Sequence, residues 1–246
     1  MKKIITLLII LTALTTSTFG ADFNMGFGAG GLLGYTFTRY TLEGGGANSF
    51  QKMDRFDFGG FLFFDATYAE ISIIFQGGNS TWEEKMIRES SSSSLSTDKG
   101  TGTVSSLGFS LLGKYPFKIH EKFTLFPMFG LEYHIALIER RKPDRYNNEY
   151  SRTKGHERVD RDKDDKPYPN LVPWNSFWID VGAGVDYFIL DRLFLRGELL
   201  FGFRLPTGHE LGAFEVVKDQ FDISDPKIAG LTGGPSLKIA VGYQFY

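Results

Sequence analysis

The end of the chain alternates strictly between apolar and small or polar side chains, which limits it to an extended strand with two unlike faces. The apolar positions are Leu237, Ile239, Val241, Tyr243 and Phe245, and Lys238, Ala240, Gly242 and Gln244 lie between them. The same period of two runs through residues 177–187 and 193–204, where charged residues occupy the second face. Apolar faces of this length correspond to strands of about ten residues. The sequence therefore predicts an all-β fold built from long antiparallel strands.

The N-terminus has the order of a secretory signal peptide. Lys2 and Lys3 precede an apolar run at residues 4–14, and small or polar residues then lead to Ala21. The apolar run is too short to cross a bilayer as a helix. We therefore predict a signal peptide at residues 1–20, which exports the protein through the inner membrane, and a single mature domain at residues 21–246.

The composition narrows the class of protein. Aromatic residues make up 15% of the chain and glycine occupies 29 positions, yet the mean hydropathy is −0.15. After the signal peptide there is no apolar run long enough for a membrane helix, which excludes a helical membrane protein. A membrane β-barrel fits, because only every second residue of its strands faces lipid. The chain has no cysteine for a disulfide. Its net charge of −2 says little about partners, and no nucleic-acid partner is predicted.

Short and long connections alternate along the chain. Five further segments have the strand pattern, at residues 25–40, 55–65, 69–77, 104–117 and 123–138. The short links are residues 66–68, 118–122 and 190–192, and the long ones are residues 41–54, 78–103, 139–173 and 205–235. This predicts an up-and-down transmembrane barrel of about eight strands, with short periplasmic turns and long extracellular loops in the bacterial outer membrane. Residues 214–223 could pair as a hairpin inside the fourth loop or contribute to a barrel of ten strands, which is one alternative. An exported soluble sandwich is the other.

The C-terminal residues carry a resemblance to a known group of proteins. Val241, Tyr243, Phe245 and Tyr246 resemble the assembly signal of outer-membrane proteins, which the barrel-insertion machinery reads, although Tyr246 adds one residue after the lipid-facing Phe245. With the strand count and the loop pattern, the mature chain resembles the small eight-stranded outer-membrane barrels of the OmpA-barrel, OmpX and OmpW type. The resemblance implies outer-membrane lipid as the surroundings and a monomer as the form of the protein.

Charged residues on the second faces of the strands predict a polar lumen. They are Glu70, Lys114, Glu132, His134, Asp180, Asp186, Arg196, Glu198, Arg204 and Lys238. An eight-stranded barrel is just wide enough to be filled by its own side chains, and buried charges must pair. We therefore expect a salt-bridged plug, with a gated or narrow solute path as the alternative.

Other features of the sequence indicate neither catalysis nor metal binding. His134 and His209 each have a glutamate nearby, but neither belongs to a catalytic motif, so no enzyme is predicted. The aspartates at 160, 162 and 164 lack the turn glycine and distal glutamate of a calcium loop, so no metal or other cofactor is predicted. Basic residues at 140–142 suit charge pairing with lipopolysaccharide phosphates.

These observations predict an outer-membrane barrel with a structural or adhesin-like role, exerted through loops that contact an extracellular or host ligand. The alternative is a narrow channel or carrier for small or hydrophobic solutes, as the OmpW-like resemblance implies. Tryptophan and tyrosine residues near the strand ends, Trp82, Trp174 and Trp178 among them, are predicted to form aromatic girdles at the two membrane interfaces.

Overall fold

The protein is a closed antiparallel barrel of eight strands. The computed structural model describes residues 24–44, 47–88, 94–143, 150–153, 156–158, 175–205 and 227–245, some of them by backbone alone. The barrel strands are β1 (Met25–Gly44), β2 (Ala47–Ala66), β3 (Ala69–Arg88), β4 (Ser94–Lys114), β6 (Phe123–Pro143), β9 (Asn175–Phe188), β10 (Leu193–Leu205) and β11 (Lys227–Gln244). Short strands outside the ring are β5 (Phe117–His120), β7 (Tyr150–Thr153) and β8 (His156–Arg158).

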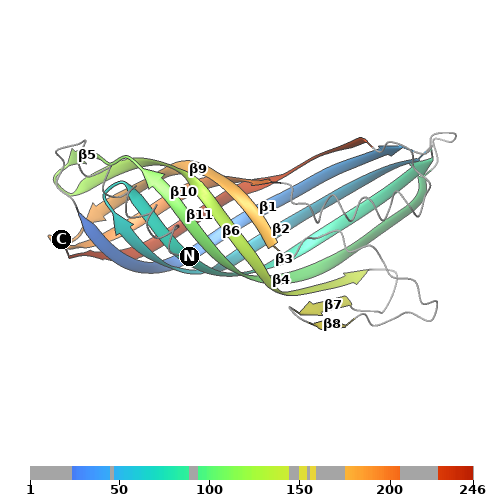
Figure 1. Cartoon of the computed structure of the whole chain (residues 1–246), viewed down its shortest axis with the longest axis horizontal. Coiled ribbons are helices and arrows are strands. Elements are labelled where there is room, and N and C mark those ends of the chain that lie inside the picture. The colour runs from blue at the N-terminus through green and yellow to red at the C-terminus, as the bar shows by residue number, and fades with distance from the viewer. Residues whose placement is uncertain are drawn as a thin grey trace, which may run out of the picture.

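The ring closes where the first barrel strand of the chain pairs with the last (Figure 1). Sequential strands pair as hairpins, β1 pairs with β11, and β4 pairs with β6. Where all eight strands are present, no strand edge is therefore left open, which satisfies the backbone hydrogen bonds that lipid cannot satisfy. The prediction of eight strands is confirmed, and the alternative of ten is wrong. Residues 214–223, on which that alternative rested, lie outside the described residues.

Two of the predicted long loops are largely strand, and a third is strand in part. β1 and β2 stay paired from Met25 with Ala66 to Gly44 with Ala47, so the predicted loop at residues 41–54 is wrong. β3 and β4 likewise stay paired through most of residues 78–103, and β11 begins at Lys227, inside the fourth predicted loop. The alternation of apolar and polar residues is lost there because both faces of these extensions are largely polar, although the backbone pairing continues.

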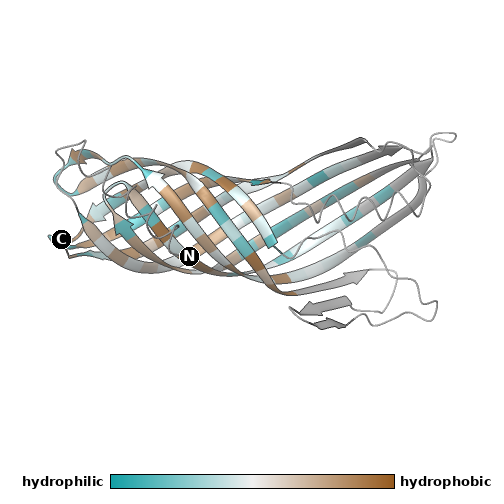
Figure 2. Cartoon of the chain, viewed as in Figure 1, coloured by the Kyte–Doolittle hydropathy of each residue, from teal (hydrophilic) through white to brown (hydrophobic). Residues whose placement is uncertain are grey.

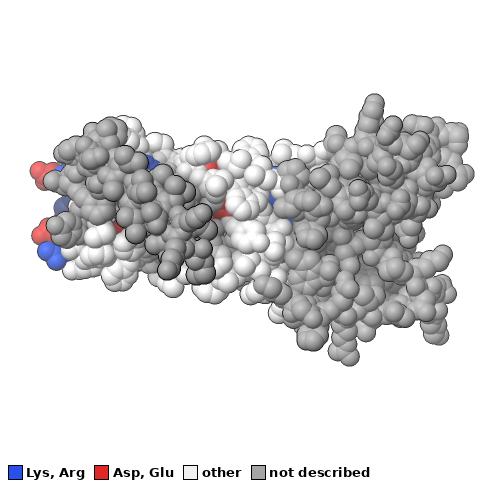
Figure 3. Space-filling view, in the orientation of Figure 1, with Lys and Arg blue, Asp and Glu red and all other residues white. Residues whose placement is uncertain are grey.

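The outside of the barrel is apolar and the inside carries the charge. Outward side chains such as Phe27, Phe129 and Leu199 are exposed, whereas the alternate residues are buried in the lumen. The exposed apolar residues form a belt around the barrel. Hydrophobic and hydrophilic segments alternate along the strands in Figure 2, and charged atoms are sparse over the middle of the described surface in Figure 3. On β9 the belt runs from Phe177 to Tyr187, eleven residues that rise about 25 Å in a tilted strand, the height of an outer-membrane barrel's apolar band.

The two ends of the barrel differ. The short turns and the paired ends of β1 and β11 lie together at one end, which in this topology is periplasmic (Figure 1). At the other end β1, β2, β3, β4, β6 and β11 continue past the belt, whereas β9 and β10 are only 14 and 13 residues long. Within the described ranges no helix is long and apolar enough to cross a membrane.

Candidate functional site

All ten residues predicted to line the lumen point into it. Glu70, Lys114, His134, Asp180, Asp186, Arg196, Glu198 and Lys238 are buried. The Glu132 side chain is 14% exposed, and Arg204, farther toward the extracellular end, is half-buried opposite Trp178. They fall into two groups at different heights, one around Arg196 near the periplasmic end and one around Glu132 farther out.

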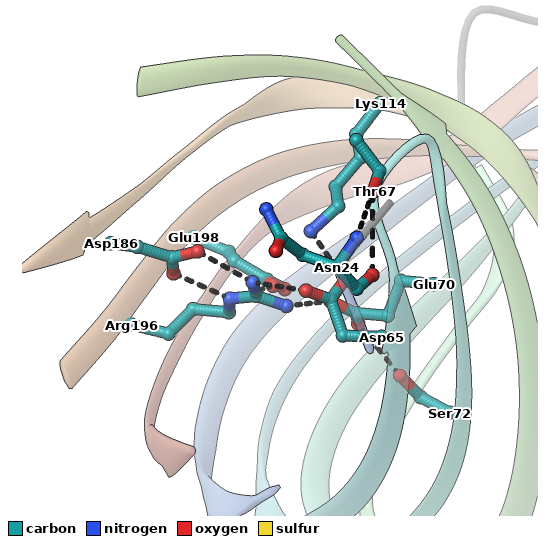
Figure 4. Close-up of polar contacts among 9 residues, drawn as sticks. All are labelled: Asn24, Asp65, Thr67, Glu70, Ser72, Lys114, Asp186, Arg196 and Glu198. Carbon is teal, nitrogen blue, oxygen red and sulfur yellow. Dashed lines mark hydrogen bonds and ion pairs between the residues drawn. The ribbon is translucent and has the colours of Figure 1, made fainter. Parts of the chain in front are cut away.

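The first group surrounds the guanidinium of Arg196 with carboxylates (Figure 4). Arg196 Nε and Nη2 donate to the two oxygens of Asp186, each at 2.7 Å. Its Nη1 donates to Glu70 Oε2 at 2.6 Å, and its Nη2 also donates to Asp65 Oδ2 at 3.0 Å. We call these residues, together with Lys114 and Glu198, the Arg196 cluster. All three guanidinium nitrogens are therefore occupied, which suits the planar donor geometry of arginine.

The Arg196 cluster joins opposite walls of the barrel. Arg196 lies on β10 and Glu70 on β3, and in the ring of eight strands these two are separated by four steps in either direction. Asp186 comes from the adjacent β9, and Asp65 comes from β2. Because one side chain reaches carboxylates on both sides, the cluster crosses the full width of the lumen.

Aromatic rings enclose the same guanidinium. The Arg196 Cζ atom lies 4.7 Å from the ring centre of Phe63 and 5.1 Å from those of Phe126 and Phe194. Lys114 Nζ lies 4.8 Å from the Phe126 ring centre as well. Such contacts are favourable when the cation is desolvated, and Arg196 is only 1% exposed. The rings and the carboxylates together fill the lumen at this height.

Two further contacts complete the cluster. Lys114 pairs with Asp65, and Ser72 Oγ donates to Glu70 Oε1 at 2.8 Å. Among the described residues Glu198 has no hydrogen-bond partner, and its Oε1 lies 3.9 Å from Arg196 Nε. The cluster therefore contains four carboxylates and two cations, so that its acidic groups outnumber its basic ones.

The second group centres on Glu132 and His134, neighbours on the lumenal face of β6. The Nε2 atom of His134 pairs with Glu132, its Nδ1 lies 3.3 Å from Gln76 Nε2, and its ring meets Trp178 edge-on. Lys238 Nζ lies 3.6 Å from the other Glu132 oxygen. Both ring nitrogens of His134 are therefore engaged inside the lumen, and this residue has the surroundings of a structural histidine rather than of an exposed general base.

The lumen also contains apolar residues that the sequence analysis did not assign to it. They form two buried clusters, one of Leu32, Phe61, Phe63, Ile74, Phe194 and Ala240 and one of Leu112, Phe126, Met128 and Leu200. The sequence does hold a signal for them, because Phe194 and Leu112 each lie two positions from a predicted lumenal cation. Asp65 and Gln76 also belong to the lumen, since they lie at alternate positions on the inward faces of β2 and β3. Both were missed because they lie near the ends of the predicted strands.

The aromatic girdle is only partly as predicted. Tyr35, Tyr187 and Tyr243 face outward in the belt. Trp178 is instead buried in the lumen, where its Nε1 donates to Ser176 Oγ at 2.9 Å, so its assignment to the girdle is wrong. Trp174 lies outside the described residues.

The residues of the predicted assembly signal lie on the last strand and just beyond it. Val241, Tyr243 and Phe245 alternate outward and are exposed to the lipid side, and Phe245 packs against Phe27 and Phe64 with ring centres 6.1 and 6.4 Å apart. Tyr246 lies outside the described residues. These rings join β11 to β1 and β2 at the periplasmic rim, where the barrel closes.

Nothing in the described part of the chain forms a metal site. No group of three or more histidine, aspartate or glutamate side chains there is placed to hold an ion. The aspartates at 160, 162 and 164 and the signal peptide lie outside the described ranges. The chemistry that the lumen does provide is charge pairing across a closed cylinder.

The chain is similar in fold to solved outer-membrane proteins. OprG from Pseudomonas aeruginosa is 12% identical, with a TM-score of 0.49 over 91% of this chain and 96% of that chain. The protease OmpT from Escherichia coli is 11% identical, with a TM-score of 0.40 over 91% and 96%. Ail of Yersinia pestis is 12% identical, with a TM-score of 0.30 over 89% and 99%. No protein-family model matches the chain, and no curated protein matches its sequence. With its apolar outside and charged inside, the chain is a β-barrel of the bacterial outer membrane.

Proposed function

We propose that this protein is a non-conducting outer-membrane barrel, whose lumen is closed by its own side chains and whose role is exerted by the part beyond the membrane. One observation carries the first half of the proposal: Arg196 on β10 is bonded to Glu70 on the opposite strand β3, with phenylalanine rings filling the space around it. An ion moving through the lumen would have to displace these buried pairs, which costs several kcal/mol for each charge left unpaired.

Conductance in a planar lipid bilayer tests the closed lumen. The refolded mature protein should give no steady current steps in concentrated KCl, and liposomes that contain it should not swell in sugar solutions. The double variant Glu70→Ala/Arg196→Ala removes both ends of the bond across the lumen and should introduce small current steps. Heat-modifiable migration on a detergent gel shows whether each preparation is folded.

A narrow channel or solute carrier is the competing function. It would give a steady conductance, or swelling with one class of solute, in the wild-type protein at the same level as in the double variant. Either result would overturn the closed lumen, because the Arg196 cluster would then not be the barrier.

The second half of the proposal concerns the extensions of β1, β2, β3, β4 and β11 past the apolar belt. They form a polar wall that stands outside the membrane, where it can contact ligands at the cell surface. A variant with residues 41–50 replaced by a two-residue turn should still migrate as a folded barrel. Bacteria that display it should adhere to epithelial cells less than bacteria that display the wild-type chain, and equal adhesion would count against a surface role for this hairpin.

A further inference from the structure

Charged side chains form a row across four neighbouring strands on the outside of the barrel. In the strand register Arg39 on β1 lies opposite Lys52 on β2, Lys52 lies opposite Glu83 on β3, and Glu83 lies opposite Lys99 on β4. Strands lie about 4.8 Å apart, so the row is about 14 Å wide. With Asp54 and Lys85, two residues away along their strands, these side chains make up what we call the cationic patch.

The patch has more positive than negative groups. Asp54 is shared by two cations, Arg39 Nη2 at 2.6 Å and Lys52 Nζ at 3.5 Å. Glu83 is shared by Lys99 Nζ at 3.3 Å and Lys85 Nζ at 4.0 Å. Four cations thus face two carboxylates, which leaves an excess of two positive charges.

The cations of the patch remain available to a ligand. Their side chains are between 43% and 57% exposed. Arg39 and Lys52 lie directly opposite each other, an arrangement of like charges that destabilises a sheet unless a counter-ion is present. Asp54 supplies only one negative charge for the pair, so a further anion at this position would be stabilised.

The position of the patch relative to the apolar belt indicates which anion it meets. The apolar belt ends at Phe56 on β2 and at Phe37 on β1, and Asp54 and Arg39 are the next outward residues on the two strands. Hydroxyl side chains of Thr81, Thr101 and Thr103 lie beside the patch on β3 and β4. A surface directly above the apolar belt, at the extracellular end, is level with the headgroups of the outer leaflet. In an outer membrane these headgroups belong to phosphorylated glycolipids.

We propose that the cationic patch on β1 to β4 binds the phosphate groups of outer-leaflet glycolipids. Arg39 offers a planar fork of donors that matches phosphate geometry, and the lysines add point charges around it. The proposal is independent of whether the lumen conducts, because it concerns the lipid-facing outside of the barrel alone.

Binding to lipid A in zwitterionic detergent micelles tests the patch, because both ends of the barrel are accessible in a micelle. The test compares the wild-type protein with the double variant Lys52→Gln/Lys99→Gln, using the rise in thermal unfolding temperature as lipid A is added. The matched control is Lys118→Gln/Lys122→Gln, which removes two exposed lysines from the periplasmic turn. We expect the apparent affinity to fall about tenfold in the patch variant and to stay within about twofold in the control.

Two further arms separate the sources of the anion. Lipid A from which the phosphates have been removed should bind the wild-type protein no better than it binds the patch variant, and inorganic phosphate at millimolar concentration should not reproduce the stabilisation. The variant Glu83→Gln, which removes a competing carboxylate, should bind lipid A more tightly. Equal weakening in the patch variant and the control, or equal stabilisation by inorganic phosphate, would overturn the proposal.

Discussion

Arg196 and Glu70 are 126 residues apart in the sequence, yet Arg196 Nη1 donates to Glu70 Oε2 at 2.6 Å across the full width of the lumen. The bond is fully enclosed, since both side chains are 0% exposed. A buried ion pair adds little net stability over an apolar core, but removing one partner leaves the other charged and unpaired. The contact therefore makes the barrel sensitive to changes at a single position inside it.

Replacing Arg196 by methionine should destabilise the barrel by about 3–5 kcal/mol, because the four carboxylates of the Arg196 cluster lose their shared cation. Unfolding in urea of the protein refolded into lipid vesicles measures the change. The control Arg192→Met removes the same charge from an exposed turn and should change the free energy of unfolding by less than about 0.5 kcal/mol. Similar losses of unfolding free energy in the two variants would show that Arg196 contributes no more to stability than an exposed arginine does.

A methyl group at Gly184 should disturb the packing of the lumen. The Cβ atom of an alanine there would overlap the ring of Phe126, which is fully buried. Gly184→Ala should therefore cost about 1–3 kcal/mol in the free energy of unfolding. At Gly197, which faces outward, the new Cβ would lie 3.7 Å from Val185 Cγ1, an ordinary contact. Gly197→Ala should be neutral or slightly stabilising, and the reverse order of the two variants would contradict the assignment of the inner face.

A charge on the belt should be costly, and one at the periplasmic turn should not. Leu199 is 61% exposed near the middle of the belt, and Ile119 is 62% exposed in β5, at the periplasmic connection before β6. Leu199→Arg should lower the free energy of unfolding in lipid by about 2–4 kcal/mol, whereas Ile119→Arg should lower it by about 1 kcal/mol at most. Equal losses of unfolding free energy in the two variants, measured by titration with denaturant in lipid, would contradict contact between the belt and the lipid.

The carboxyl of Asp54 should titrate below the usual range for aspartate. Burial acts to raise the pKa of Asp54, but hydrogen bonds from Arg39 and Tyr35 and the charge of Arg39 outweigh burial and lower the pKa. Its pairing thus stabilises the folded state above the carboxyl's unfolded pKa, and this contribution is lost as the pH falls through the lowered value. Carbon NMR of the labelled carboxyl measures the titration, and Arg39→Gln should move it toward higher pH. No movement in that variant would assign the low pKa to another cause.

Much of the architecture follows from the period of two in the sequence. It identified the eight strands, and it placed Glu70, Arg196 and Lys238 on one face without any knowledge of their partners. It failed where that period disappears. In residues 61–64 every position is apolar, so the lumenal Phe61 and Phe63 could not be told from the outward Leu62 and Phe64 without counting back from Asp65.

The partners within the lumen were beyond the reach of the sequence. Which carboxylate meets Arg196 depends on the stagger between strands on opposite walls, and that stagger is a property of the closed ring rather than of any strand. The extents of β2 and β3 were also misjudged, because hydrogen-bonded strands that leave the lipid no longer need an apolar face. The cationic patch escaped notice for the same reason, since Arg39 came at the end of one predicted strand while Lys52 and Lys99 fell in predicted loops.

The bond between β10 and β3 also has a mechanical consequence. A thin-walled cylinder yields most easily by flattening into an ellipse, and a strut fixed across one diameter opposes that deformation along its own axis. The Arg196 cluster is such a strut near the periplasmic end, whereas the extracellular extension is bounded by β1, β2, β3, β4, β6 and β11, beyond the ends of β9 and β10. Stiffness is thus concentrated in the part that is held by the bilayer, and compliance in the part that meets the outside.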